Sequence, residues 1–169
     1  ISFRYSRNLA NGDGLVFNAG ERVEGYTNFL WTWLMSIPER LGWSTPGVSI
    51  VVTIALTLVG VRLALQLARK VFGDEWLSLI TTAALVTNMS FLGYATSGLE
   101  TMLQTTLLLG VAVILVPSRD DAEPSVAGRI LAGVLAGAAV LTRLDSVVLV
   151  GAWFGVHAWW LWRKAGQPL

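Results

Sequence analysis

An arginine and an aspartate interrupt a long apolar stretch of this chain, in Leu141-Thr142-Arg143-Leu144-Asp145. The guanidinium of Arg143 carries a planar fork of N–H donors that matches the geometry of a phosphate. Arg143 and Asp145 could instead form a structural ion pair, and Thr142 with Asp145 could cap a helix. The spacing leaves these alternatives open.

A further carboxylate lies in the motif Ser97-Gly98-Leu99-Glu100. The spacing matches a capping box, in which Ser97 begins a helix and Glu100 at the third helical position bonds back to it. A carboxylate this close to an apolar segment is also costly and often functional. Glu100 is therefore a candidate for binding a polar substrate as well as for capping.

The segment Val23-Glu24-Gly25-Tyr26-Thr27-Asn28 separates a turn-rich loop from a Trp-rich apolar stretch. One interpretation is a site for a polar headgroup at a membrane surface. The other is a loop-to-helix junction, with Thr27 or Asn28 as the cap and Tyr26 as an interfacial anchor.

Two arginines near the N-terminus, Arg4 and Arg7, are three residues apart. They would share one helical face if residues 2–9 form the short amphipathic helix that their pattern indicates. That face would be either a solvated basic surface or a contact for phosphate.

Several classes of site are excluded by the composition. The chain has no Cys, so thiolate ligands and Cys nucleophiles are excluded. Its single His, His157, has no visible partner in the sequence for a triad, and no metal-ligand set is evident. The net charge is +1, and its basic residues are scattered, so nothing indicates a nucleic-acid partner.

The elements that must position these residues are membrane helices. Hydrophobic residues make up 54% of the chain and charged residues only 14%, against about a quarter in soluble domains. The mean hydropathy is positive. We therefore expect an all-α polytopic transmembrane bundle with about five spans, as a fragment of a longer chain.

The expected organisation has two parts. Residues 1–45 form an outer-face loop and a short interfacial helix over residues 27–41, with Trp31, Trp33 and Trp43 at headgroup level. Residues 46–169 form transmembrane helices of the same module, the first beginning at Ser44-Thr45-Pro46 and the second capped by Asp74. The expected spans are 48–67, 76–94, 99–116, 127–141 and 146–162.

Two basic clusters orient these spans. Arg69-Lys70 and Arg163-Lys164 both end a span, and the positive-inside rule places them in the cytoplasm. Residues 1–45 and the turns at 97–98 and 143–145 then all fall on the outer face. A polar site built from distant segments is expected there, in a multi-pass protein of the plasma membrane.

Four motifs in order resemble the transmembrane module of the bacterial GT-C glycosyltransferases, closest to the actinobacterial enzymes that add terminal β-1,2-arabinofuranose. These motifs are Ile1-Ser2-Phe3-Arg4-Tyr5 with Arg7-Asn8-Leu9, Gly14-Leu15-Val16-Phe17-Asn18 with Val23-Glu24-Gly25-Tyr26-Thr27-Asn28, Ser97-Gly98-Leu99-Glu100-Thr101, and Leu141-Thr142-Arg143-Leu144-Asp145. The last departs from a more usual Arg-Pro-Asp-Gly form at Leu144 and Ser146.

The resemblance implies transfer of a sugar from a polyprenyl-phosphate donor, bound from the membrane lipid, to an arabinan or other cell-wall glycan. The expected catalytic acidic pair would precede Ile1, with Glu24 as a candidate second acid. Arg4 and Arg143 would bind the donor phosphate. Sugar binding would involve Glu24, Tyr26, Asn28, Glu100 and Asp145. The sequence identifies no certain cofactor, and a divalent cation that neutralises the donor phosphate is left open.

A transporter or flippase of a lipid-linked or small polar substrate is the rival hypothesis. Transporters are typically built from inverted repeats with broken helices near the midplane. The sequence shows no internal repeat, and its polar motifs lie at the ends of the expected helices.

Overall fold

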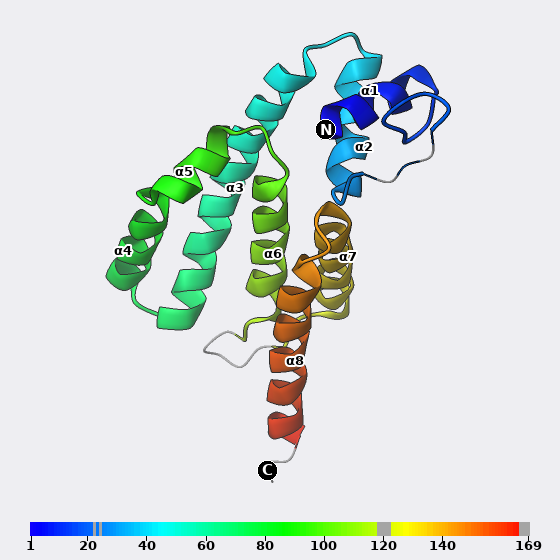
Figure 1. Cartoon of the computed structure of the whole chain (residues 1–169). Helices are drawn as coiled ribbons and strands as arrows, with labels where there is room; N and C mark the ends of the chain where they lie inside the picture. The colour runs from blue at the N-terminus through cyan, green and yellow to red at the C-terminus, as the bar shows by residue number, and fades with distance from the viewer. Residues whose placement is uncertain (22, 24, 118–122, 166–169) are drawn as a thin grey trace.

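The computed structural model describes residues 1–21, 23, 25–117 and 123–165, and over these residues the chain is all α-helical (Figure 1). The all-α prediction is therefore confirmed for the part of the chain that is described. The helices are α1 (Ser2–Asn11), α2 (Phe29–Arg40), α3 (Thr45–Phe72), α4 (Glu75–Val86), α5 (Met89–Thr96), α6 (Thr101–Leu115), α7 (Val126–Thr142) and α8 (Ser146–Ala165).

Local capping explains where several helices begin. The Ser44 hydroxyl accepts a hydrogen bond from the Gly47 amide at 3.4 Å, and Pro46 occupies the first turn of α3. The Asp74 carboxylate accepts one from the Leu77 amide at 2.7 Å, which begins α4. Both predicted helix starts are confirmed.

The long helices run side by side, with α6 between α3 and α7, and α8 packed against α6 (Figure 1). Helices α1 and α2 pack together at the end where α3 begins. At the other end, Lys70 of α3 donates to the Val113 carbonyl of α6 at 2.6 Å. Lys164 lies 3.6 Å from Glu123, which precedes α7. The two basic clusters therefore share one end of the bundle.

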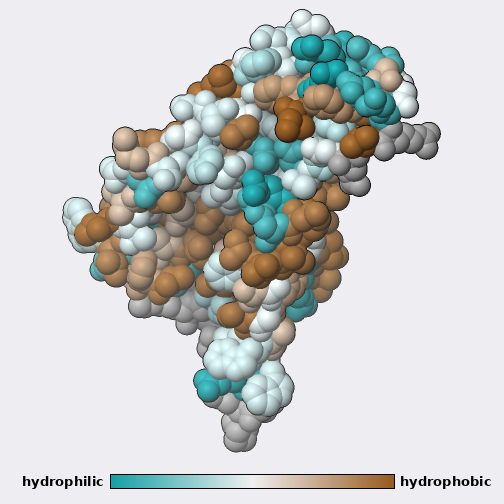
Figure 2. Space-filling model, in the orientation of Figure 1, coloured by the Kyte–Doolittle hydropathy of each residue, from teal (hydrophilic) through white to brown (hydrophobic). Residues whose placement is uncertain are grey.

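The core is small, and much apolar surface remains uncovered. Ala132 and Ala136 of α7 pack against Val111 and Leu115 of α6. In α3 only 17% of the most apolar stretch is buried. Figure 2 shows hydrophilic residues gathered around α1 and hydrophobic residues over much of the face below. Such extensive exposed apolar surface is unusual for a protein surrounded by water.

Among the described helices, only α3, with 28 residues, is by itself long and apolar enough to cross a membrane. Helices α4 and α5 pass the same test together, but they are bent by 62° at their junction. Helices α6 and α7 are apolar but shorter. A bundle of about five spans is thus not shown by these helices, and it stays a prediction.

Two expectations were wrong in detail. The single span at 76–94 is broken, because the Asn88 side chain accepts hydrogen bonds from the amides of Ser90 and Phe91, at 3.0 and 3.2 Å, and starts a new helix. Trp31 is 1% exposed and packs against Met35 and Leu103, so it is a core residue instead of a headgroup anchor.

Candidate functional site

A tight turn between α7 and α8 presents the charged residues. Arg143 leaves the helix in an extended conformation, and the Ser146 amide bonds back to the Arg143 carbonyl at 3.0 Å. The turn therefore consists of Arg143, Leu144 and Asp145 alone. The Thr142 hydroxyl donates to the Ala138 carbonyl within α7, so it does not pair with Asp145 as a cap.

Arg143 bridges two carboxylates that come from different parts of the sequence. Its Nη2 and Nε atoms donate to Asp145 Oδ2 at 3.0 and 3.3 Å, and its Nη1 donates to Glu100 Oε1 at 3.4 Å. Of the alternatives that the sequence left open for this motif, the structure shows the ion pair between Arg143 and Asp145. Three of the five guanidinium N–H groups are used in these contacts, which leaves two for another acceptor.

Two residues that sequence reasoning missed complete this cluster. The Gln104 side-chain amide donates to Asp145 Oδ1 and to the Ser146 hydroxyl, both at 2.8 Å. Gln104 lies one helical turn after Glu100, so both side chains project from the same face of α6. That spacing on an otherwise apolar helix was the signal that could have identified Gln104. We call Glu100, Gln104, Arg143, Asp145 and Ser146 the polar cluster.

The electrostatics of the polar cluster favour its ionised form. The hydrogen bonds from Arg143, followed by its charge and the Gln104 amide, hold the pKa of the Asp145 carboxyl below its ordinary value. Asp145 in turn raises the pKa of Arg143, with a smaller contribution from Glu100. Stabilisation by Asp145 is therefore present at neutral pH and is lost only as the pH falls through the lowered pKa.

The capping-box interpretation of Ser97 and Glu100 is wrong. Helix α6 begins at Thr101, and Glu100 sits at its N-cap position without a side-chain capping bond. Gly98 adopts φ +68°, a left-handed conformation that separates Ser97 from the helix. The Glu100 side chain is thereby free to reach Arg143.

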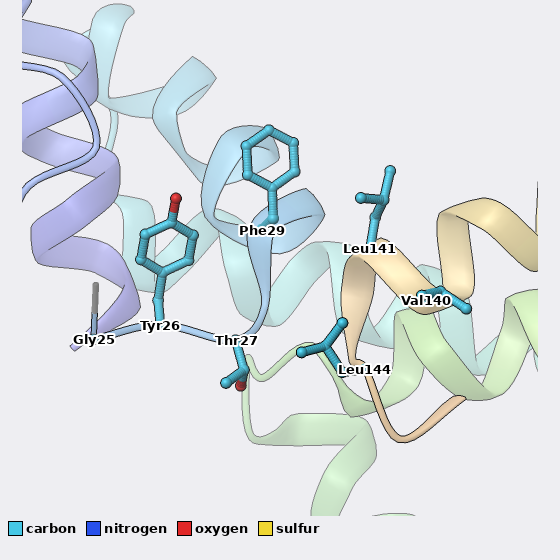
Figure 3. Close-up of a pocket in the computed structure, with 7 residues that line it drawn as sticks. All are labelled: Gly25, Tyr26, Thr27, Phe29, Val140, Leu141 and Leu144. Atoms are coloured by element: carbon cyan, nitrogen blue, oxygen red, sulfur yellow. The ribbon is translucent and has the colours of Figure 1, made fainter. Parts of the chain in front are cut away.

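An open pocket of about 480 Å³ lies where the segment before α2 meets the end of α7 (Figure 3). Tyr26 and Thr27 line it on one side, and Leu141 and Leu144 on the other. The Tyr26 ring packs against the buried Tyr5 ring, with 4.7 Å between centroids. The structure thus places Tyr26 in a pocket next to the turn that carries Arg143.

Other predicted site residues have structural partners. Asn28 is buried, donates to the Ser2 hydroxyl at 2.9 Å, and accepts from the Thr32 hydroxyl at 3.1 Å. Glu24 lies outside the described residues. No group of three or more Asp, Glu or His side chains that could hold a metal occurs among the residues that were described.

Arg4 closes the loop that follows α1. Its Nε donates to the Phe17 carbonyl at 2.8 Å, its Nη2 donates to Asn18 Oδ1 at 2.6 Å, and the guanidinium lies 4.2 Å from the Phe17 ring centroid. These contacts give Arg4 a structural role in holding the loop that follows α1.

Replacing Arg4 by alanine is expected to open this loop. Thermolysin should then cut before Leu15, Val16 or Phe17 at least about tenfold faster, a change of about 1.4 kcal/mol in the opening equilibrium. Arg7→Ala is the matched control, because the Arg7 side chain is 66% exposed and its contact within the described part of the chain is one long ion pair, to Glu39 at 3.5 Å. Equal cleavage of both variants would show that Arg4 does not hold the loop.

Comparison with protein-family models, with curated proteins and with solved structures finds no match to this chain.

Proposed function

We propose that this chain is part of a polytopic membrane glycosyltransferase that transfers a sugar, arabinofuranose, from a polyprenyl-phosphate donor to a cell-wall glycan on the outer face. The polar cluster is the observation that carries this proposal. It joins Glu100, Arg143 and Asp145 at one end of apolar helices, beside a pocket lined by Tyr26. Sugar phosphates need a cationic donor group for the phosphate and acceptors for hydroxyls, and the cluster contains both.

A membrane setting is supported by the distribution of surface chemistry. Apolar side chains are exposed along α3, α4, α7 and α8, for example Leu58, Ile80, Val134 and Val148. Both basic clusters lie at the end opposite the polar cluster. In a bilayer this arrangement would place the polar cluster on the outer side.

Within this proposal Arg143 is the better candidate for the donor phosphate. Arg143 keeps two N–H donors beyond its carboxylate contacts. Arg4 keeps three by the same count, but its contacts, to the Phe17 carbonyl and the Asn18 side chain, hold the loop that follows α1 and involve no residue of the polar cluster. The phosphate leaving group gains charge as its bond to the sugar breaks, so a fixed cation at that position would favour departure.

A transporter or flippase is the second candidate, and the break between α4 and α5 favours it. Broken helices often line transport pathways because their ends expose polar backbone groups. Here several of the freed groups are satisfied locally, since the Thr87 hydroxyl donates to the Ala84 carbonyl at 3.3 Å, the Asn88 amide donates to the Leu85 carbonyl at 3.1 Å, and the Asn88 side chain caps α5. The break therefore supports transport less strongly than the polar cluster supports transfer.

The deciding experiment is a transfer assay with the full-length protein in lipid vesicles. We expect synthetic polyprenyl-phosphate arabinofuranose to glycosylate an arabinan oligosaccharide added on the outer side. The same vesicles, loaded with labelled donor on the inner leaflet, report flipping. The assay is run with arabinose and with hexose donors. If the donors are flipped but no glycan product forms with either, the result would favour the transporter and contradict the enzyme.

A further inference from the structure

The two carboxylates of the polar cluster are held very differently. Both oxygens of Asp145 are occupied, because Oδ1 accepts from Gln104 at 2.8 Å and Oδ2 accepts from Arg143 at 3.0 Å. The Gln104 contact comes from the beginning of α6, and the Arg143 contact comes from the end of α7. With the further contacts from Arg143 Nε at 3.3 Å, each oxygen accepts twice, so Asp145 is fixed in position although 58% of its side-chain surface is exposed.

A hydrogen bond to Ser146 orients the Gln104 side chain. The Ser146 hydroxyl donates to the Ala139 carbonyl at 3.0 Å, so its oxygen is turned to accept from Gln104 at 2.8 Å. Ser146 is fully buried. This chain of hydrogen bonds fixes which way the Gln104 amide donates, and it directs that amide at Asp145.

Glu100 is held by a single weak contact. Its Oε1 atom lies 3.4 Å from Arg143 Nη1, and 16% of its side-chain surface is exposed. An ionised carboxylate has roughly four acceptor positions, so most of the acceptor capacity of Glu100 is unused. It also lies next to the cation that we assign to the donor phosphate.

We infer that Gln104 is a positioning residue that locks Asp145 against Arg143, and that Glu100 is the open carboxylate that accepts hydrogen bonds from a sugar hydroxyl. The identity of the sugar rests on the proposed function. The locking of Asp145 rests only on the hydrogen bonds of the polar cluster.

The test compares four single variants and one double variant in lipid nanodiscs. Thermal unfolding is measured for each protein alone and with added arabinan oligosaccharide or polyprenyl-phosphate arabinofuranose. Glu100→Gln should weaken binding of one of these ligands at least about tenfold, or about 1.4 kcal/mol. Glu39→Gln is its matched control, because Glu39 also has 16% side-chain exposure and one long ion pair, to Arg7 at 3.5 Å. It should change binding less than about twofold.

Gln104→Met and Asp145→Asn test the locking. Each should lower the unfolding temperature, and their combination should lower it by less than the sum, since both weaken the same contact between Gln104 and Asp145. In the transfer assay Gln104→Met should lower kcat at least about tenfold while KM changes less than about twofold, because a displaced Arg143 would meet the phosphate poorly in the transition state.

The outcomes separate this inference from the proposed function. If the wild type transfers the sugar and Glu100→Gln binds both ligands as tightly as Glu39→Gln does, the role of Glu100 alone is overturned. Additive unfolding effects of Gln104→Met and Asp145→Asn overturn the locking. A wild type that neither binds nor transfers the sugars overturns the proposed function together with the hydroxyl role, and the unfolding data still decide the locking.

Discussion

Replacing Arg143 by alanine is expected to lower sugar transfer at least about 100-fold, the loss typical of removing one donor from a developing anion. Two effects combine in this variant. Under the proposed function the donor phosphate loses its cation, and Glu100 and Asp145 are left as neighbouring carboxylates without the charge between them. The decrease should be in kcat more than in KM, because the charge on the phosphate grows toward the transition state.

Two further variants show whether the guanidinium acts directly. Arg143→Lys keeps the charge but loses the planar fork, so its activity should lie between those of the wild type and Arg143→Ala. Arg129→Ala removes another arginine–glutamate pair, to Glu123 at 3.8 Å, outside the polar cluster, and should leave transfer unchanged. Arg143→Ala with wild-type kcat in folded protein would remove Arg143 from the site.

Replacing Gly98 by alanine is expected to destabilise the protein by about 2–4 kcal/mol, the sum of backbone strain and a steric clash. Gly98 has φ +68°, and an added Cβ would lie 2.5 Å from the Ser49 hydroxyl oxygen. That hydroxyl cannot move away freely, because it donates to the Pro46 carbonyl at 2.8 Å. The melting temperature should fall by roughly 4–16 °C.

The two contributions can be separated experimentally in detergent. Gly93→Ala is the matched control, since Gly93 lies within α5 with open space around its Cβ position, and it should be neutral or slightly stabilising. Ser49→Ala added to Gly98→Ala should recover the steric part and leave the strain. A Gly98→Ala variant that melts with the wild type would contradict the left-handed turn at this position.

What could be predicted from the sequence was local. The starts of α3 and α4 depend on Ser44 and Asp74, whose capping partners lie three residues away. The break at Asn88 was equally local, but a long apolar run concealed its capping role. In Ser97-Gly98-Leu99-Glu100 the glycine conformation overrode a spacing that otherwise matches a cap.

The remaining features depend on contacts between distant segments. Gln104 meets Asp145 only after α6 and the α7–α8 turn have packed together. Trp31 is buried because α2 packs mainly against α1 and its Trp31 joins a cluster that includes Leu103 of α6, whereas the composition of that segment alone favoured an interface with lipid. The sequence predicted that Glu100, Arg143 and Asp145 lie on one outer face. Periodicity could not show that the Arg143 side chain contacts both carboxylates.

The short turn between α7 and α8 has a consequence for biogenesis. In a chain inserted into a bilayer, these two helices would enter as one hairpin with Arg143 and Asp145 at its tip. A lone charge is costly at the bilayer centre. Because Arg143 and Asp145 are two residues apart and bonded to each other, they can cross as a neutral pair before α6 docks. The substitution Asp145→Asn would leave the Arg143 charge unpaired. It would therefore make translocation of the hairpin less favourable, independently of any effect on sugar transfer.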